Sequence, residues 1–189
     1  MNSILRFVSS FLTDGLPYLI IVMPLYLSGR ILYRKIQQKQ QGRKTDLCRE
    51  FVLVLLTAYL TMLFVQTWVV DTGGTNEINL IPFSVIEVQI ADMYRSEANY
   101  SLFMLNILGN IAVFVPIGMM TAYLYKLDLK KCMFTGFLIS LIIEVVQLPL
   151  NRTSDVDDLI LNTTGAAAGY FLYHIFNKLT AKNLCRFRK

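Results

Sequence analysis

FMLNILGNIAVFVPIGMMTAYLY, residues 103–125, is the stretch of sequence that decides the fold. It carries no charged residue, and it is long enough for a helix that crosses about 30 Å of hydrocarbon, which takes roughly 20 residues. Asn106 and Asn110 nevertheless lie within it, and polar side chains are costly in hydrocarbon unless they meet one another. The stretch therefore predicts a membrane helix that contributes to a polar site.

Four further apolar stretches extend this prediction to an all-α fold, a polytopic membrane helical bundle. The five predicted transmembrane helices cover approximately residues 12–33, 51–70, 103–125, 132–150 and 159–177. Hydrophobic residues make up 54% of the chain, which is too many for an ordinary soluble domain. Because 189 residues leave no room for a second substantial domain, we expect residues 1–189 to form a single integral membrane domain.

The basic residues predict the orientation of the bundle. Of 18 Lys and Arg residues, 15 lie in or beside the loops after the first and third spans or in the carboxyl-terminal tail. The other three are Arg6, Arg95 and Arg152. Because Lys and Arg accumulate on the cytoplasmic side, the amino terminus is predicted outside and the carboxyl terminus in the cytoplasm. Because the basic residues gather on one side, the net charge of +5 is explained by their role in setting the topology and in contacting anionic lipid head groups. No nucleic-acid partner is expected.

The predicted outer loop, residues 71–102, is too apolar for a free linker and too charged to span the membrane. Pro82 should interrupt a helix, and Ser84 is a natural N-cap for a helix that follows. We expect an interfacial or re-entrant segment against the outer face of the bundle. On the cytoplasmic side, residues 34–50 should form a helical extension or a flexible connection.

Two of the later spans each carry a stripe of polar and small residues on one face, counting 100° per residue. The stripe on the fourth span consists of Gly136, Ser140, Glu144 and Gln147. The stripe on the fifth span consists of Asp158, Asn162, Gly165 and Gly169. Because Gly-x-x-x-Gly spacing lets membrane helices approach closely, we expect the two stripes to pack together. A homo-oligomer contact through the two glycines is the alternative.

The polar groups of the third, fourth and fifth spans are predicted to meet in an outer-leaflet cavity, because the charge-derived topology places them in the outer halves of their helices. The candidate ligand-binding residues are Asn79, Asn106, Asn110, Glu144, Gln147, Arg152, Asp155, Asp158 and Asn162. Glu144 needs a partner, and Arg152 is the nearest basic residue, so we expect an ion pair between them. Asp155 also suits a helix cap. A cluster that only holds the helices together is the alternative to a ligand site.

The sequence predicts no metal site and no other cofactor. Cys48, Cys132 and Cys185 are far apart and fall on the predicted cytoplasmic side, where thiols stay reduced. His174, the only histidine, is predicted across the bilayer from the polar cluster. An enzyme that acts on a lipid-linked envelope substrate is an alternative, in which Glu144 and the Asp155, Asp157 and Asp158 carboxylates supply a buried acid and a base or the ligands of a divalent ion. Because Ser and Thr nucleophiles lack an evident partner, binding is preferred over catalysis.

Four motifs in the second half of the chain resemble those of the VanZ-like membrane proteins. They are Asn79-Leu-Ile-Pro-Phe83, Asn110-x-x-x-Phe114-x-Pro116-x-Gly118, Glu144-x-x-Gln147 and Asp155-x-x-Asp158-x-x-x-Asn162-x-x-Gly165. They follow the order of the family and define a VanZ-like core over about residues 79–170. The resemblance implies a small multi-pass protein of the bacterial cell membrane. The named member of that family is associated with low-level resistance to the lipoglycopeptide teicoplanin.

The resemblance also implies a class of ligand. Teicoplanin-type drugs and lipid-linked peptidoglycan precursors both present a polar head with an acyl chain at the outer leaflet, where the polar cluster is predicted. We expect membrane lipids and such an amphiphile as partners, with Arg152 and the amides meeting the head group and Asp155 and Asp158 orienting them. A transporter is a third alternative, which the absence of an inverted repeat in the sequence disfavours.

Overall fold

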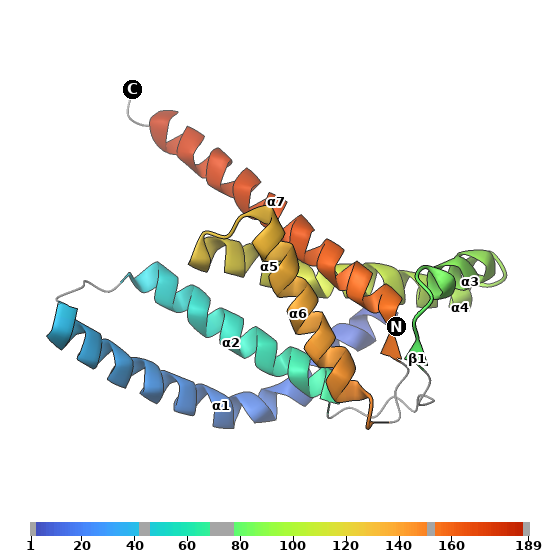
Figure 1. Cartoon of the computed structure of the whole chain (residues 1–189), viewed down its shortest axis with the longest axis horizontal. Helices are drawn as coiled ribbons and strands as arrows, with labels where there is room; N and C mark the ends of the chain where they lie inside the picture. The colour runs from blue at the N-terminus through green and yellow to red at the C-terminus, as the bar shows by residue number, and fades with distance from the viewer. Residues whose placement is uncertain (1–2, 42–45, 69–77, 151–153, 187–189) are drawn as a thin grey trace. The chain divides into compact units, whose positions relative to one another are not determined.

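The computed structural model is helical apart from two short strands, and it describes residues 3–41, 46–68, 78–150 and 154–186 (Figure 1). The predicted all-α class is therefore confirmed. The chain divides into two compact units, Met1–Thr72 and Gly73–Lys189. The prediction of a single integral membrane domain stays a prediction.

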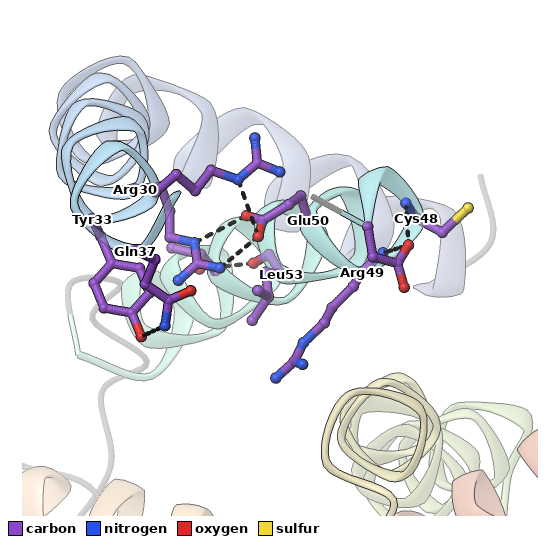
Figure 2. Close-up of polar contacts among 10 residues, drawn as sticks. Arg30, Tyr33, Gln37, Cys48, Arg49, Glu50 and Leu53 are labelled. Carbon is purple, nitrogen blue, oxygen red and sulfur yellow. Dashed lines mark hydrogen bonds and ion pairs between the residues drawn. The ribbon is translucent and has the colours of Figure 1, made fainter. Parts of the chain in front are cut away.

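The first unit is a pair of antiparallel helices, α1 (Ser3–Gln41) and α2 (Leu47–Trp68). Their direction follows from two contacts. Arg30 in the second half of α1 pairs with Glu50 at the start of α2 (Figure 2), whereas Gln66 near the end of α2 donates to Asp14 of α1 over 3.3 Å. The predicted helical extension after the first span is confirmed as far as Gln41. Residues 42–45 lie outside the described part of the chain.

The second unit holds the remaining elements. They are β1 (Ile78–Asn79), α3 (Ser84–Met93), α4 (Glu97–Phe103), the π-helical turn η1 (Met104–Leu108), α5 (Gly109–Tyr125), α6 (Leu129–Gln147), β2 (Ser154–Asp155) and α7 (Val156–Arg186). The two strands pair in parallel, with Ile78 opposite Ser154 and Asn79 opposite Asp155. This pairing ties the segment before α3 to the start of α7.

The buried face of α6 repeats every fourth residue, as an α-helix requires for one stripe. Its buried residues are Cys132, Gly136, Ser140 and Glu144. The predicted polar stripe on this helix is therefore confirmed for three of its members and continues to Cys132. Gln147, the last residue of α6, is only partly buried.

Glycines bring α5 and α7 into close contact. A Cβ added at Gly165 would overlap the carbonyl oxygen of Ile111, and one at Gly169 would overlap that of Val115. Gly118 of α5 makes the reciprocal approach to the carbonyl of Ala166. The predicted close approach through Gly165 and Gly169 is confirmed, and it takes place within the chain.

The predicted partner of these glycines was wrong, because they face α5 and not α6. The helix α6 instead meets α7 through Gly136, which lies against the side chain of Ala166, and through a bond between Ser140 and Asn162. Residues 162 and 166 are turned by about 60° from residues 165 and 169 around the helix axis. The helix α7 can therefore present one face to α6 and the neighbouring face to α5.

Three helices in the described ranges are long and apolar enough to cross a membrane. They are Ser9–Lys39, Leu47–Trp68 and Glu97–Tyr125, which match the first three predicted spans. The helices α6 and α7 lie where the fourth and fifth spans were predicted, but length and composition do not select them within the described residues. The count of five transmembrane helices thus stays a prediction.

Candidate functional site

Glu144 lies on the buried face of α6 and is only 5% exposed. Its Oε2 accepts a hydrogen bond from the Ser154 hydroxyl at 2.7 Å and another from the backbone N–H of Asp155 at 3.3 Å. Both donors belong to β2, so this strand covers the carboxylate. The predicted partner Arg152 lies outside the described residues, and the ion pair between Glu144 and Arg152 stays a prediction.

Asp155 connects the strand pair to the first turn of α7. Its Oδ1 accepts from the backbone N–H of Asp157 at 3.0 Å and from the amide of Asn79 at 3.3 Å. The first bond is that of a helix cap, so the predicted capping role is confirmed. Burial raises the pKa of the Asp155 carboxyl above its ordinary value, and the nearby Asp157 carboxylate acts in the same direction, against the two hydrogen bonds.

Asp157 was not among the candidate ligand-binding residues, yet it accepts three backbone hydrogen bonds. The donors are the N–H groups of Phe83, Val85 at 3.1 Å and Ile86 at 3.2 Å. These groups belong to the first turn of α3, whose N-cap Phe83 has a left-handed backbone (φ 66°) and no side-chain cap bond. Asp157 therefore caps α3 from a position 74 residues after Phe83.

The prediction that Ser84 is the N-cap of the outer-loop helix was wrong. The helix begins at Ser84 as expected, but the Ser84 hydroxyl donates to the carbonyl of Ile81 at 2.9 Å and accepts from the Asn79 amide at 2.7 Å. The Asn79 Oδ1 in turn accepts from the backbone N–H of Ile81 at 3.1 Å. These local bonds shape the turn before α3 and leave its capping to a residue of α7.

Two amides link α7 to the helices on either side of it. Asn110 of α5 donates to Oδ1 of Asp158 at 2.5 Å, and Asn162 donates to the Ser140 hydroxyl at 2.9 Å. Asn162 is buried, and its Oδ1 has no hydrogen-bond partner within the described ranges. Asp158 also lies within electrostatic range of Glu144, Asp155 and Asp157, so four carboxyl groups share this region.

The side chain of Asn106 is exposed and makes no hydrogen bond to the cluster within the described residues. Asn106 and Asn110 would align on an unbroken α-helix, but Asn106 lies in η1. A π-helical turn has more residues per turn than an α-helix, so the angle between Asn106 and Asn110 around the helix axis differs from the angle predicted with α-helical spacing. The structure thus brings together Asn79, Asn110, Glu144, Asp155, Asp158 and Asn162, and it adds Ser140, Ser154 and Asp157.

Neutral donors hold this cluster together. No Lys or Arg of the described ranges pairs with any of the four carboxylates, and no three His, Cys, Asp or Glu side chains there are arranged to hold a metal ion. Glu144 and Asp158 each have one oxygen that accepts no hydrogen bond from a described residue. What the cluster offers to a ligand is therefore a set of partly occupied carboxylate acceptors beside amide groups.

Comparison with known families adds a second line of evidence. The family model VanZ/LLP1 matches residues 51–177, which is more than half of the chain and includes every described residue of the cluster. The chain belongs to the VanZ/LLP1 family. The resemblance stated from the four motifs is thereby confirmed, and the match also takes in most of α2, which the motifs do not reach. Neither a comparison with curated proteins nor one with solved structures gave a match.

Family membership and the three long apolar helices together indicate that this VanZ/LLP1 chain is a membrane protein. Polar side chains that gather between helices of a membrane protein are usually functional, since each is costly to bury in hydrocarbon. The cluster of Glu144, Asp155, Asp158 and the three asparagines is for this reason the candidate functional site.

Proposed function

We propose that this VanZ/LLP1 chain binds the polar head of an amphiphile at the outer leaflet of the bacterial cell membrane. In this proposal α6 and α7 are the fourth and fifth membrane spans, the amino terminus lies outside and the carboxyl terminus lies in the cytoplasm. The ligand is a lipoglycopeptide or a lipid-linked cell-wall precursor, and binding contributes to low-level teicoplanin resistance.

The observation that carries the proposal is the convergence of four carboxyl groups with no basic partner in the described ranges. Helix packing alone needs one or two polar groups at an interface. Both oxygens of Asp157 are engaged in capping α3, but Glu144, Asp155 and Asp158 each keep one oxygen that accepts no hydrogen bond from a described residue. Such acceptors suit a head group rich in hydrogen-bond donors, such as sugar hydroxyls, amides and amines.

The test uses the full chain in phosphatidylcholine nanodiscs with teicoplanin as the probe. Asp158→Asn and Glu144→Gln should each weaken binding about tenfold, because each replaces a carboxyl oxygen acceptor with an amide nitrogen that can only donate, while keeping the shape of the side chain. Asp92→Asn is the matched control, because this partly exposed carboxylate pairs with Arg95 at 2.8 Å and with no other basic residue of the described ranges. It should change affinity less than about twofold.

Two further comparisons complete the test. The same glycopeptide core without its acyl chain should bind more weakly, since the proposal requires an amphiphile. A lipid-linked wall precursor replaces teicoplanin as the probe if the drug does not bind. Equal affinity of wild type, Asp158→Asn and Glu144→Gln for whichever probe binds, or no binding of either probe, would leave the cluster as a helix-packing device.

One contact favours a second function, catalysis on a lipid-linked substrate. Because the Ser154 hydroxyl donates to Glu144 at 2.7 Å, a serine does have the partner that the sequence did not reveal. Glu144 could take the hydroxyl proton as Ser154 Oγ forms a bond to an electrophilic carbonyl carbon or phosphorus atom of the substrate. The bond from that atom to the leaving oxygen would then break, and the protonated Glu144 would return the proton to the leaving oxygen. Release of product from a lipid-linked precursor by wild type, and its loss in Ser154→Ala, would establish this function in place of simple binding.

A further inference from the structure

The turn that precedes α3 exposes large apolar side chains. Leu80 is 74% exposed, Ile81 68% and Phe83 52%. Phe83 also has a left-handed backbone, with φ 66°, a conformation that Gly or Asn adopts with less strain. A bulky side chain that is half exposed gains little at such a position from packing within its own chain. The turn of residues 80–83 therefore indicates an apolar partner outside the chain.

Side chains of the protein satisfy the backbone donors of this turn. The N–H of Ile81 donates to the Asn79 side chain at 3.1 Å. The N–H of Phe83 donates to the Asp157 carboxylate, and Pro82 between them has no N–H. Backbone groups that enter hydrocarbon must find their partners within the protein, because no water is present there. The N–H groups of Ile81 and Phe83 meet this condition.

The depth of the turn follows from the helix on which α7 packs. The candidate span Glu97–Tyr125 has 29 residues, or about 43 Å of helix, and Asn110 lies roughly 20 Å from both of its ends. Wherever a hydrocarbon core about 30 Å thick is placed along this helix, Asn110 lies several ångströms inside the boundary. Asn110 donates to Asp158, and the preceding residue Asp157 accepts from the N–H of Phe83. The turn is thus held close to residues within the hydrocarbon.

The other end of α3 is polar. Asp92 and Arg95 form an ion pair of 2.8 Å, and their side chains are 37% and 73% exposed. The Asn99 amide of α4 donates to the carbonyl of Asp92 at 3.1 Å, and Figure 1 shows α3 and α4 side by side. Because α4 continues into the candidate span, the polar turn between the two helices lies toward water. The start of α3, about 15 Å away along a helix of 10 residues, then lies toward the hydrocarbon.

We propose that the turn of residues 80–83 inserts among the acyl chains of one leaflet. Leu80, Ile81 and Phe83 contact lipid, and the bond from the Phe83 N–H to Asp157 holds the turn at this depth. The exposed apolar surface of the turn continues on the candidate span, where Leu102 and Leu108 are also exposed. Of the two arrangements expected for the outer loop, interfacial and re-entrant, this is the re-entrant one.

The experiment measures tryptophan fluorescence of the full chain in phosphatidylcholine vesicles, with and without bromine atoms on the acyl chains. Bromine quenches a tryptophan that lies among those chains. Trp68, the only tryptophan of the sequence, is first replaced by Phe. In this background Phe83→Trp should lose about half of its fluorescence or more in brominated lipid, because the turn lies within the hydrocarbon. Tyr94→Trp is the matched control at the polar end of α3, where Tyr94 is 83% exposed, and it should lose less than about a fifth.

Iodide, which stays in water, should quench Tyr94→Trp and spare Phe83→Trp. Leu80→Trp is the second variant in case Phe83→Trp does not insert, because the high exposure of Leu80 leaves room for the larger ring. Equal quenching by brominated lipid at both ends of α3, or quenching of the turn by iodide, would overturn the proposal. Quenching of the turn by neither agent would overturn it as well, because protein and not lipid would then cover the turn.

Discussion

Replacing Asp157 is the sharpest test of the tertiary structure, because one carboxylate of α7 caps a helix that begins 74 residues earlier in the chain. Asp157→Ala would leave the N–H groups of Phe83, Val85 and Ile86 without their acceptor. Counting three charge-assisted hydrogen bonds at full strength would overestimate the loss of stabilising free energy. The three bonds share one carboxylate, and water can reach the partly exposed first turn of α3.

The loss of a helix cap gives a better magnitude. Removal of a cap costs about 1–2 kcal/mol, and loss of a negative charge at a helix N-terminus costs about 0.3–1 kcal/mol more. We therefore expect the local opening free energy of α3 to fall by about 2 kcal/mol, which corresponds to roughly thirtyfold faster exchange of the Val85 and Ile86 amide hydrogens. Asp157→Asn keeps one acceptor oxygen and should show about half of this change in free energy.

Hydrogen exchange measured by mass spectrometry on the full chain in detergent is the assay, with peptides that cover residues 83–88. Asp92→Asn is the control, because Asp92 lies at the other end of α3 and its carboxylate takes part in an exposed pair with Arg95. It should shift exchange by less than about 0.5 kcal/mol. Unchanged exchange at Val85 and Ile86 in Asp157→Ala would refute the capping role. Equal acceleration by Asp92→Asn would show that the whole segment loosens for another reason.

Three further predictions test other parts of the second unit. Gly118→Ala should destabilise the protein by about 2 kcal/mol, because the new Cβ would overlap the Ala166 carbonyl. In the control Gly109→Ala the new Cβ meets nothing within 4 Å, so this variant should leave Tm unchanged. Equal Tm values of the two variants in detergent would argue against the close contact of α5 and α7. Asn110→Ala and Asp158→Ala should be coupled by about 1–2 kcal/mol in a double-mutant cycle of thermal stability, because the bond between them joins α5 and α7; additive effects would mean that the bond contributes nothing. Because burial raises the pKa of Asp155 above 3.8, the folded state favours the protonated carboxyl, so this contribution to stability is complete below pH 3.8 and is lost as the pH rises through the raised pKa. Asp155→Asn stays neutral and can still cap α7, so its Tm relative to wild type should rise between about pH 3.5 and pH 7, and a difference that does not vary with pH would contradict the assignment.

The candidate site was predicted in large part from the position of polar residues within apolar stretches. Asn110, Glu144, Asp158 and Asn162 were found in this way, because polar groups in hydrocarbon are costly whatever their neighbours are. The same reasoning placed Asn106 beside these residues, but its side chain is exposed and makes no hydrogen bond to them within the described part of the chain, because the helical count assumed α-helical turns and Asn106 lies in the π-helical turn η1. Nothing in the sequence marks residues 104–108 as a π-helical turn.

The contacts of Asp157 and Ser154 were missed for a different reason. Both residues form hydrogen bonds with groups from other segments. Asp157 accepts from backbone N–H groups of α3, and Ser154 donates to the Glu144 carboxylate. The run of acidic residues at positions 155, 157 and 158 made a helix cap predictable, but not which carboxyl would cap which helix. Asp155 caps its own helix, and Asp157 caps α3.

The sequence by itself determined that this is a helical membrane protein of the VanZ/LLP1 family, which faces of α6 and α7 carry polar and small residues, and where α2, α3, α6 and α7 begin to within a few residues. These properties depend on the composition and periodicity of contiguous segments, so they can be read along the chain. Only the tertiary structure decided that Gly165 and Gly169 pack on α5 and that Asp157 caps α3. A hydrogen bond or a close helix contact requires two distant groups to lie within a few ångströms in a defined direction, and the folded chain alone sets that distance and direction.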